Sequence, residues 1–137
     1  MTEDRERVMA WVAAYEEAWR AGDQDAVGRL FTEDARYLRS PYDDAPLVGH
    51  DAIRGFWDAD DGATFTVTAE AVAAEARDAV VRLEVHYLEP ERQEYRDLWV
   101  LRFARDGRVE HFEEWAYWPG KPYTAAATTG GQPSAAP

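Results

Sequence analysis

The stretch "EYRDLWVLRFARDGRVEHFEEWAYW", residues 94–118, consists of two alternating segments separated by a turn signal. Tyr, Trp, Leu and Phe recur at alternate positions of residues 94–104, and "RDG" at 105–107 is typical of a β-hairpin turn. Because successive side chains of a strand point to opposite faces, the adjacent Glu113 and Glu114 cannot both face the solvent. We predict that Glu114 faces the interior and that Glu113 faces outward.

Strand patterns continue upstream of this hairpin. "TFTVTAEAVAAEA", residues 64–76, begins with β-branched alternation, and "DAVVRLEVHYLE", residues 78–89, is strongly strand-like. A shorter strand is predicted near residues 35–39, ahead of a loop rich in Pro and Asp. The second half of the chain therefore predicts a meander of long antiparallel strands.

Helical patterns occupy the first half of the chain. Apolar residues recur at helical spacing in residues 3–21, and Gly22 is well placed to end that helix. Residues 23–31 predict a second, shorter helix, and residues 49–57 predict a third. Helices followed by strands indicate an α+β fold with the helices packed on one face of an antiparallel sheet.

Length and local composition indicate one domain with a tail. The chain of 137 residues fits a single domain, which we assign to residues 1–123. Residues 124–137 are rich in Pro, Gly, Ala and Thr and have no periodicity, so we expect them to form a flexible tail.

Charge and composition exclude several classes of partner. The chain has 27 acidic and 15 basic residues, and a net charge of −12 repels phosphate backbones, so no nucleic acid partner is expected. It contains no run of 18 apolar residues and no charged-then-apolar leader, so neither a membrane span nor a signal peptide is predicted. The lack of cysteine excludes disulfides and makes a cytoplasmic location the default expectation.

Three motifs carry a family resemblance. "YEEAWRAGDQDAVGRLFTEDARYLRSP" (15–41) has "GD" before its second helix and an "F-T-x-D-A" exit, and "LVGHDAIRGFW" (47–57) opens the third helix with "G-H-x-A-I". "LWVLRFARDGRV" (98–109) is followed by an aromatic-acidic strand. Over residues 6–118 the sequence resembles the nuclear transport factor 2-like superfamily, in its SnoaL-like branch.

The resemblance implies a cone-shaped α+β fold, with three N-terminal helices packed on a strongly curved antiparallel sheet of four to six strands. It also implies a pocket between sheet and helices that takes a small hydrophobic molecule, with no cofactor. A homodimer through the outer face of the sheet is the family's usual arrangement. The chemistry does not follow, because the superfamily includes isomerases, epoxide hydrolases, polyketide cyclases, dehydratases and non-catalytic binders.

Ketosteroid isomerase chemistry is not expected from the residues at the corresponding places. Tyr15 falls at the place of the tyrosine that donates a hydrogen bond to the developing enolate in those enzymes. The place of their general-base aspartate, before the proline of "LRSP", holds Ser40, and Trp99 stands where their second aspartate lies. A serine cannot serve as a carboxylate base at neutral pH, so two of the three groups are missing.

Glu114 is the principal catalytic candidate. Epoxide hydrolases and polyketide cyclases place an acid on the last strand in an aromatic-x-acid-aromatic setting, and "FEEW" matches that setting with Glu114 as the acid. Among aromatic side chains, desolvation would raise its pKa and suit it to general acid/base work. The alternative is a glutamate at the strand edge that lies in solvent or pairs with Arg96 or Arg102.

The segment "DAVVRLEVHY" supplies a second candidate. Aligned with the strand on which the hydrolases carry an arginine and an aspartate, it brings Glu84 and His86 to those places, with Arg82 on the same face. A shift of one residue would instead turn the intervening aliphatic residues inward and expose all three charges. A sheet that is covered on one face usually turns its polar side chains toward water on the other face, which favours the second register.

Asp97 stands alone on an otherwise apolar strand face. A lone carboxylate there is costly unless it is paired, so Asp97 is either hydrogen-bonded structurally or part of the pocket. We expect Glu114 to act as the acid/base, helped by Asp97 or His86, with Tyr15 as a hydrogen-bond donor. The expected pocket walls are Tyr37, Ser40, Phe56, Trp57, Trp99, Phe112 and Trp118.

No metal site is predicted. Asp43 and Asp44, and likewise Asp58, Asp60 and Asp61, sit in turns where Asp is favoured for local hydrogen bonding. Two other functions stay open. One is a non-catalytic protein that holds an apolar molecule in the same pocket, and the other is a protein-association module with an outward apolar patch.

Overall fold

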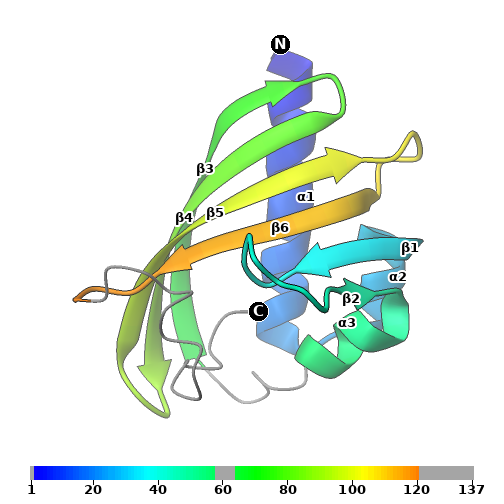
Figure 1. Ribbon diagram of the computed structural model, residues 1–137. Coiled ribbons are helices and arrows are strands. Elements are labelled where there is room, and N and C mark those ends of the chain that lie inside the picture. The colour runs from blue at the N-terminus through cyan, green and yellow to red at the C-terminus, as the bar shows by residue number, and fades with distance from the viewer. Residues whose placement is uncertain (1, 58–63, 121–137) are drawn as a thin grey trace.

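The computed structural model describes residues 2–57 and 64–120 (Figure 1). The helical elements are α1 (Thr2–Ala21), the 3₁₀ turn η1 (Gln24–Ala26), α2 (Val27–Leu30) and α3 (His50–Trp57). The strands are β1 (Phe31–Leu38), β2 (Leu47–Val48), β3 (Thr64–Glu75), β4 (Asp78–Glu89), β5 (Gln93–Phe103) and β6 (Val109–Tyr117). None of the helices in these ranges has the length and apolarity that a membrane span requires. The predicted tail, residues 124–137, lies outside the described residues.

The six strands form one sheet in the order β2-β1-β6-β5-β4-β3. The helix α1 crosses one face of this sheet, and α2 and α3 pack beside β1 and β2 (Figure 1). The long strands bend as they pass α1 (Figure 1). The predicted α+β class, with helices on one face of a curved sheet, is confirmed.

One strand pairing differs from the antiparallel expectation. β1 and β6 run parallel, whereas the other neighbouring strands are antiparallel. Three long strands separate β1 from β6 in the sequence, so no hairpin fixes their relative direction. The predicted second helix also ends early, because Phe31 has an extended backbone and begins β1. The register of β1 against β6 shifts between Phe31 and Arg36, which breaks the alternation that marks a strand.

A β-bulge sets which glutamate of β6 faces the helices. The register of β6 against β5 shifts by one residue at Glu110, which is extra in the ladder. The inward set therefore passes from Val109 to Phe112 and Glu114. Glu114 is 0% exposed, while Glu113 is half-buried on the opposite face, as predicted.

The inner side of the sheet is filled by an apolar stripe of α1. Its buried residues are Val8, Trp11, Val12, Tyr15, Ala18 and Trp19. The Trp11 ring lies edge-on to Phe31 and Phe103, with centroid distances of 5.6 and 6.0 Å. Its indole N–H donates to the Leu30 carbonyl at 3.0 Å. These contacts fix the rotation of α1, and Tyr15, one turn later, faces the same interior.

Arginines of α1 also tie the helix to β3, the last strand in the sheet order. Their side chains donate hydrogen bonds to backbone carbonyls of β3 and of the turn after it. The bonds join Arg5 to Ala71, Arg7 to Ala76 and Arg20 to Phe65. An edge strand has one side without a neighbouring strand, so α1 covers this edge as well as the inner face.

Candidate active site

β5 and β6 bring two carboxyl groups together on the inner face of the sheet. Trp99 lies directly opposite Glu114, and Asp97 precedes Trp99 by two residues on the same face, so the two acids are diagonal neighbours. Asp97 is 4% exposed and Glu114 is 0% exposed. Within the described residues these are the only charged side chains that are buried. No buried cation of that part of the chain therefore neutralises them.

Burial raises the pKa of Asp97 to about 6. Hydrogen bonds that favour the ionised form oppose this rise; they come from the Glu114 side chain, the Trp99 indole and the backbone N–H groups of Trp115 and Leu98. The Trp99 indole N–H donates to Asp97 Oδ2 at 3.2 Å. A hydrogen bond between two carboxyl groups needs a proton on one of them, so Asp97 and Glu114 form a proton-sharing pair.

Two tyrosine hydroxyls point into the same interior. Tyr15 Oη from α1 and Tyr37 Oη from β1 are 3.1 Å apart, and both residues are fully buried. Burial, and next the charge of Glu114, raise the pKa of Tyr15 well above its usual value. Burial, then Tyr15 and Glu114, do the same for Tyr37. Both hydroxyls therefore stay protonated at neutral pH and can donate hydrogen bonds.

Aromatic rings surround the tyrosine pair. The Tyr15 ring centroid lies 4.7 Å from that of Trp99 and 5.1 Å from that of Trp57. Tyr37 stacks on Phe112 at 4.3 Å. The expected wall residues that meet here are Tyr37, Phe56, Trp57, Trp99 and Phe112. Five of the seven expected wall residues therefore share one aromatic cluster with Tyr15.

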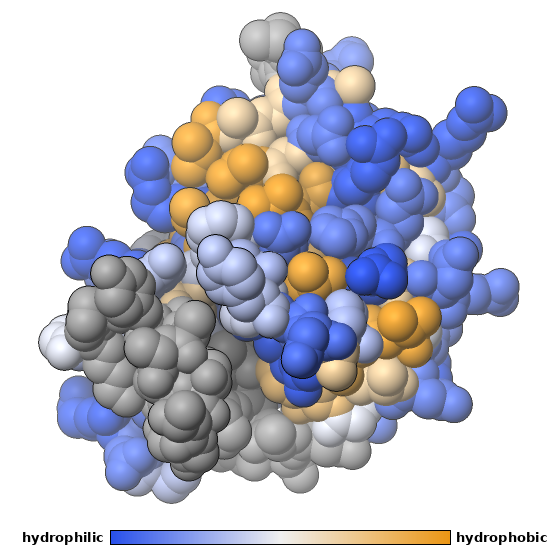
Figure 2. All heavy atoms as spheres, in the orientation of Figure 1, coloured by the Kyte–Doolittle hydropathy of each residue, from blue (hydrophilic) through white to orange (hydrophobic). Residues whose placement is uncertain are grey.

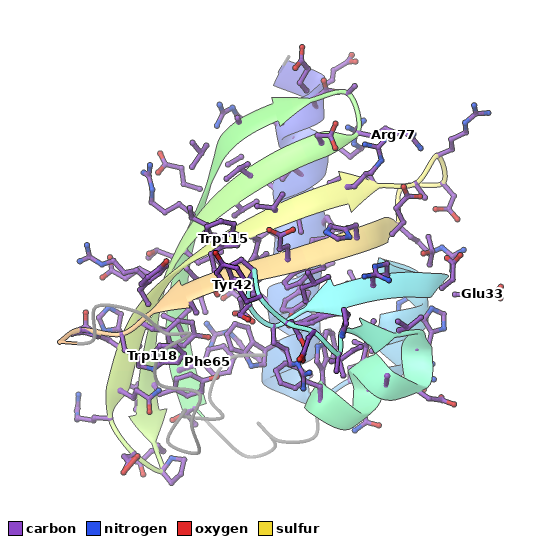
Figure 3. The ribbon with its side chains drawn as sticks, in the orientation of Figure 1. Glu33, Tyr42, Phe65, Arg77, Trp115 and Trp118 are labelled. Atoms are coloured by element: carbon purple, nitrogen blue, oxygen red, sulfur yellow. The ribbon has the colours of Figure 1, made fainter. Side chains whose placement is uncertain are left out.

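The other two expected wall residues occupy different places. Trp118 packs against Tyr95 at 5.3 Å, and it lies toward the end of the sheet where Phe65 is also found (Figure 3). Ser40 is half-buried in the turn after β1, where its carbonyl accepts a hydrogen bond from the Asp43 N–H at 3.1 Å. Ser40 thus belongs to the turn that leads from β1 toward β2.

The structure corrects the expectation that His86 assists Glu114. β4 turns Val81, Leu83 and Val85 inward and leaves Arg82, Glu84 and His86 on the outer face. His86 Nε2 lies 2.8 Å from Glu84 Oε2, so His86 pairs on that outer face. Three charged groups cost far more to bury than three aliphatic ones, and this difference decides the register.

The acidic turns do not supply a metal centre in the described residues, which contain no group of three or more His, Asp or Glu able to hold an ion. Asp43 is instead held by Arg39, with Arg39 Nε 2.9 Å from Asp43 Oδ2. Burial acts to raise the pKa of Asp43, but the bonds from Arg39 and from the Ala45 N–H lower it overall. Asp58, Asp60 and Asp61 lie outside the described residues.

Two polar roles in the site do not follow from the sequence patterns. Trp99 was expected only as a wall, yet its indole N–H binds Asp97. Tyr37 was likewise expected as a wall, yet its hydroxyl is the partner of Tyr15. The spacing of Asp97 and Trp99 is the available signal for the first, because residues two apart share a strand face. The second depends on the docking of α1 on β1 and has no local signal.

Comparisons with known proteins place this geometry in a family. Residues 12–112 match the SnoaL-like domain, and no curated protein matches the chain. One similar structure is that of SalBIII, an epoxide hydrolase/cyclase-like enzyme in pyran ring formation in polyether salinomycin. It is 22% identical with a TM-score of 0.66, over 88% of this chain and 95% of that chain.

A second similar structure is that of an M. tuberculosis LEH-like epoxide hydrolase. It is 16% identical with a TM-score of 0.67, over 82% of this chain and 84% of that chain. At these identities the two likenesses support the fold. The family match extends over most of the described domain, and the chain belongs to the SnoaL-like domain family of the nuclear transport factor 2-like superfamily.

Proposed function

We propose that the chain binds a small hydrophobic molecule against the inner face of its sheet and acts on it by general acid/base catalysis of cyclase or hydrolase type. The observation that carries this proposal is the buried pair of Asp97 and Glu114. Burial of two acids in an apolar interior lowers the stability of the fold, and apolar side chains would fill the same space without this cost. The two structural neighbours, an epoxide hydrolase/cyclase-like enzyme and an epoxide hydrolase, support the reaction class.

A carboxyl pair that shares a proton offers an acid and a base together. The protonated group can donate to an oxygen that develops negative charge, such as the oxygen of an opening epoxide. The ionised group can take the proton of the attacking water or hydroxyl. The Tyr15–Tyr37 pair supplies one more donor, because the bond between the hydroxyls uses only one of their two protons.

The aromatic cluster supports a hydrophobic ligand. Trp57, Trp99 and Phe112 surround the hydroxyl pair with ring faces and edges. Sites for small molecules are typically lined by such side chains, with a few polar groups that fix orientation. In this site the acid pair and the tyrosine hydroxyls are those polar groups.

The adjacent glutamates of β6 give a matched test. A panel of epoxides, enones and cyclisable polyketides is assayed with the wild type, Glu114→Gln and Glu113→Gln. We expect Glu114→Gln to lower kcat about 10²- to 10⁴-fold, because one proton-transfer group is lost. Glu113→Gln, on the opposite face of the same strand, should leave kcat unchanged. Equal turnover by both variants would refute the role of Glu114.

Non-catalytic binding is the second candidate, because the aromatic cluster suits an apolar molecule whether or not a proton is transferred. In this case the same interior holds an apolar molecule, and the acids only orient it. Tryptophan fluorescence during titration with the panel distinguishes the two. Saturable binding without turnover, unchanged in Glu114→Gln, would establish binding in place of catalysis.

We also propose a homodimer formed through the outer face of the sheet. Apolar side chains gather over β3 to β5 on this face, among hydrophilic ones (Figure 2). We define the outer apolar patch as Val80, Leu98, Val100 and Trp115, which are joined by the cross-strand pairs of Val80 with Val100 and of Leu98 with Trp115. Leu98 is 38% exposed. An apolar centre with a polar rim is the usual anatomy of a protein interface.

A further inference from the structure

We infer that Trp99 is a positioning residue that makes Asp97 the ionised member of the acid pair and leaves the shared proton on Glu114. The observation is the bond from the Trp99 indole N–H to Asp97 Oδ2 at 3.2 Å, directly opposite Glu114 in the sheet. The catalytic consequence rests on the proposed function, but the placement of the proton does not.

The chemistry of the indole sets the direction of the effect. Its N–H can only donate, so it stabilises an acceptor and gains most when that acceptor is charged. Trp99 is 1% exposed and Asp97 is 4% exposed, so water screens the bond little. A protonated Asp97 would weaken this bond, and an ionised Asp97 strengthens it.

Further donors act at the same carboxylate. The backbone N–H groups of Trp115 and Leu98 also lower the pKa of Asp97, which favours its charged form. With Asp97 as the acceptor, the bond between the two acids must use a proton of Glu114. That bond likewise lowers the pKa of Asp97, as expected when Glu114 is its donor.

The position of the indole is fixed by its neighbours. Its ring centroid lies 4.7 Å from that of Tyr15, 5.0 Å from that of Phe112 and 6.2 Å from that of Trp11. A ring held on these sides cannot turn its N–H away from Asp97 without displacing the core.

Among the described residues, the groups around Asp97 do not supply a competing cation. Tyr15 from α1 and Tyr37 from β1 are neutral, and Glu114 from β6 is the second acid. On the β4 side, Leu83 lies opposite Asp97 and is apolar. The indole and the backbone N–H groups are therefore what distinguishes Asp97. Glu114 then serves as the general acid and Asp97 as the general base.

Trp99→Phe tests the inference, because it removes the N–H and keeps most of the ring. The carboxyl titration of Asp97 is followed by ¹³C NMR in the wild type, Trp99→Phe and the control Trp118→Phe, whose ring packs on Tyr95. We expect the Asp97 midpoint to rise by about one pH unit in Trp99→Phe, as for loss of a hydrogen bond to a charged group. It should not move in the control. An unchanged midpoint in a folded Trp99→Phe would overturn the inference.

A second measurement uses the wild type alone and so does not depend on the folding of a variant. The Trp99 indole ¹H–¹⁵N resonance should shift with the same midpoint as the Asp97 carboxyl. An indole resonance that stays still while Asp97 titrates would contradict the inference. An unchanged Asp97 midpoint or an unmoved indole resonance would leave the proposed function intact. The proposed function is tested separately, by the turnover of Glu114→Gln.

Discussion

Asp97 couples protonation to folding at the scale of a single residue. Burial raises its pKa from 3.8 to about 6, so the native state binds this proton more tightly than the unfolded state. The stabilisation is fully present below pH 4 and is lost as the pH rises toward 6. A difference of about two pKa units corresponds to about 3 kcal/mol.

We therefore expect the wild type to lose stability relative to Asp97→Asn as the pH rises from 4 to 7, by up to about 3 kcal/mol. Urea unfolding of both proteins at each pH measures this difference, in which the contributions of acids remote from Asp97 cancel. Thr66→Ala, at an exposed position and without a change in any titratable group, is the control and should show a constant difference from the wild type. A constant difference for Asp97→Asn would contradict the raised pKa.

The side-chain directions of the site were largely predictable residue by residue. Strand alternation places Glu114 and Asp97 inward, because the aromatic residues beside them must be buried. The same argument applied to β4 favours the aliphatic residues over His86, and the structure follows it. The resemblance that suggested His86 carries no information on register. The bonds of Trp99 and Tyr37 depend on side-chain contacts that no single strand pattern contains.

At the scale of elements, the register of the β5–β6 hairpin cannot be predicted from its turn alone. The Ala104 N–H donates to the Arg108 carbonyl at 2.7 Å, so this pair closes the turn. A regular ladder that continued from the pair of Ala104 and Arg108 without a bulge would place Glu113 opposite Trp99. The bulge at Glu110 moves Glu114 there instead. Beyond the bulge, Glu114 shares its parity with Phe112, Ala116 and Trp118, which are all buried.

The attachment of α1 to the edge of β3 predicts a stability effect. Arg5 donates to the Ala71 carbonyl in a partly buried hydrogen bond. Arg5→Met should lower the free energy of unfolding by about 1 kcal/mol and promote association through the open edge. Chemical unfolding and light scattering measure the two effects.

The matched control is Arg29→Met. Arg29 of α2 has a side chain that is 67% exposed, and it pairs with Asp23, which precedes η1. Exposed ion pairs of this kind contribute little to stability. The stability of Arg29→Met should stay close to that of the wild type. If both variants behave alike, the arginines do not protect the edge.

At the scale of the whole molecule, the order of helices and strands was predictable and one pairing was not. Periodicities of 3.6 and 2 separate the two halves of the chain, so the α+β class follows from the sequence. The parallel contact of β1 with β6 joins segments about 75 residues apart, as in the pair of Arg36 with His111, and depends on the assembled sheet. The bend of the sheet came from the family resemblance, because alternation specifies faces and not curvature.

The proposed dimer predicts a change of mass in solution. Leu98→Asp places a charge in the outer apolar patch and should convert a dimer to a monomer in sedimentation velocity. Tyr42→Asp is the control, since Tyr42 is 85% exposed and lies in the loop between β1 and β2. It should leave the dimer intact. A wild type that sediments as a monomer would refute the dimer.

The central claim is that Asp97 and Glu114 work together in opposite protonation states, and the pH–rate profile tests it most directly. With a substrate from the panel, kcat/KM of the wild type should rise with a midpoint near pH 6 as Asp97 ionises, and fall at higher pH as the shared proton is lost. Asp97→Asn should lack the acidic limb. A wild-type profile that is flat from about pH 4 to 9, or an acidic limb that survives in Asp97→Asn, would contradict the claim.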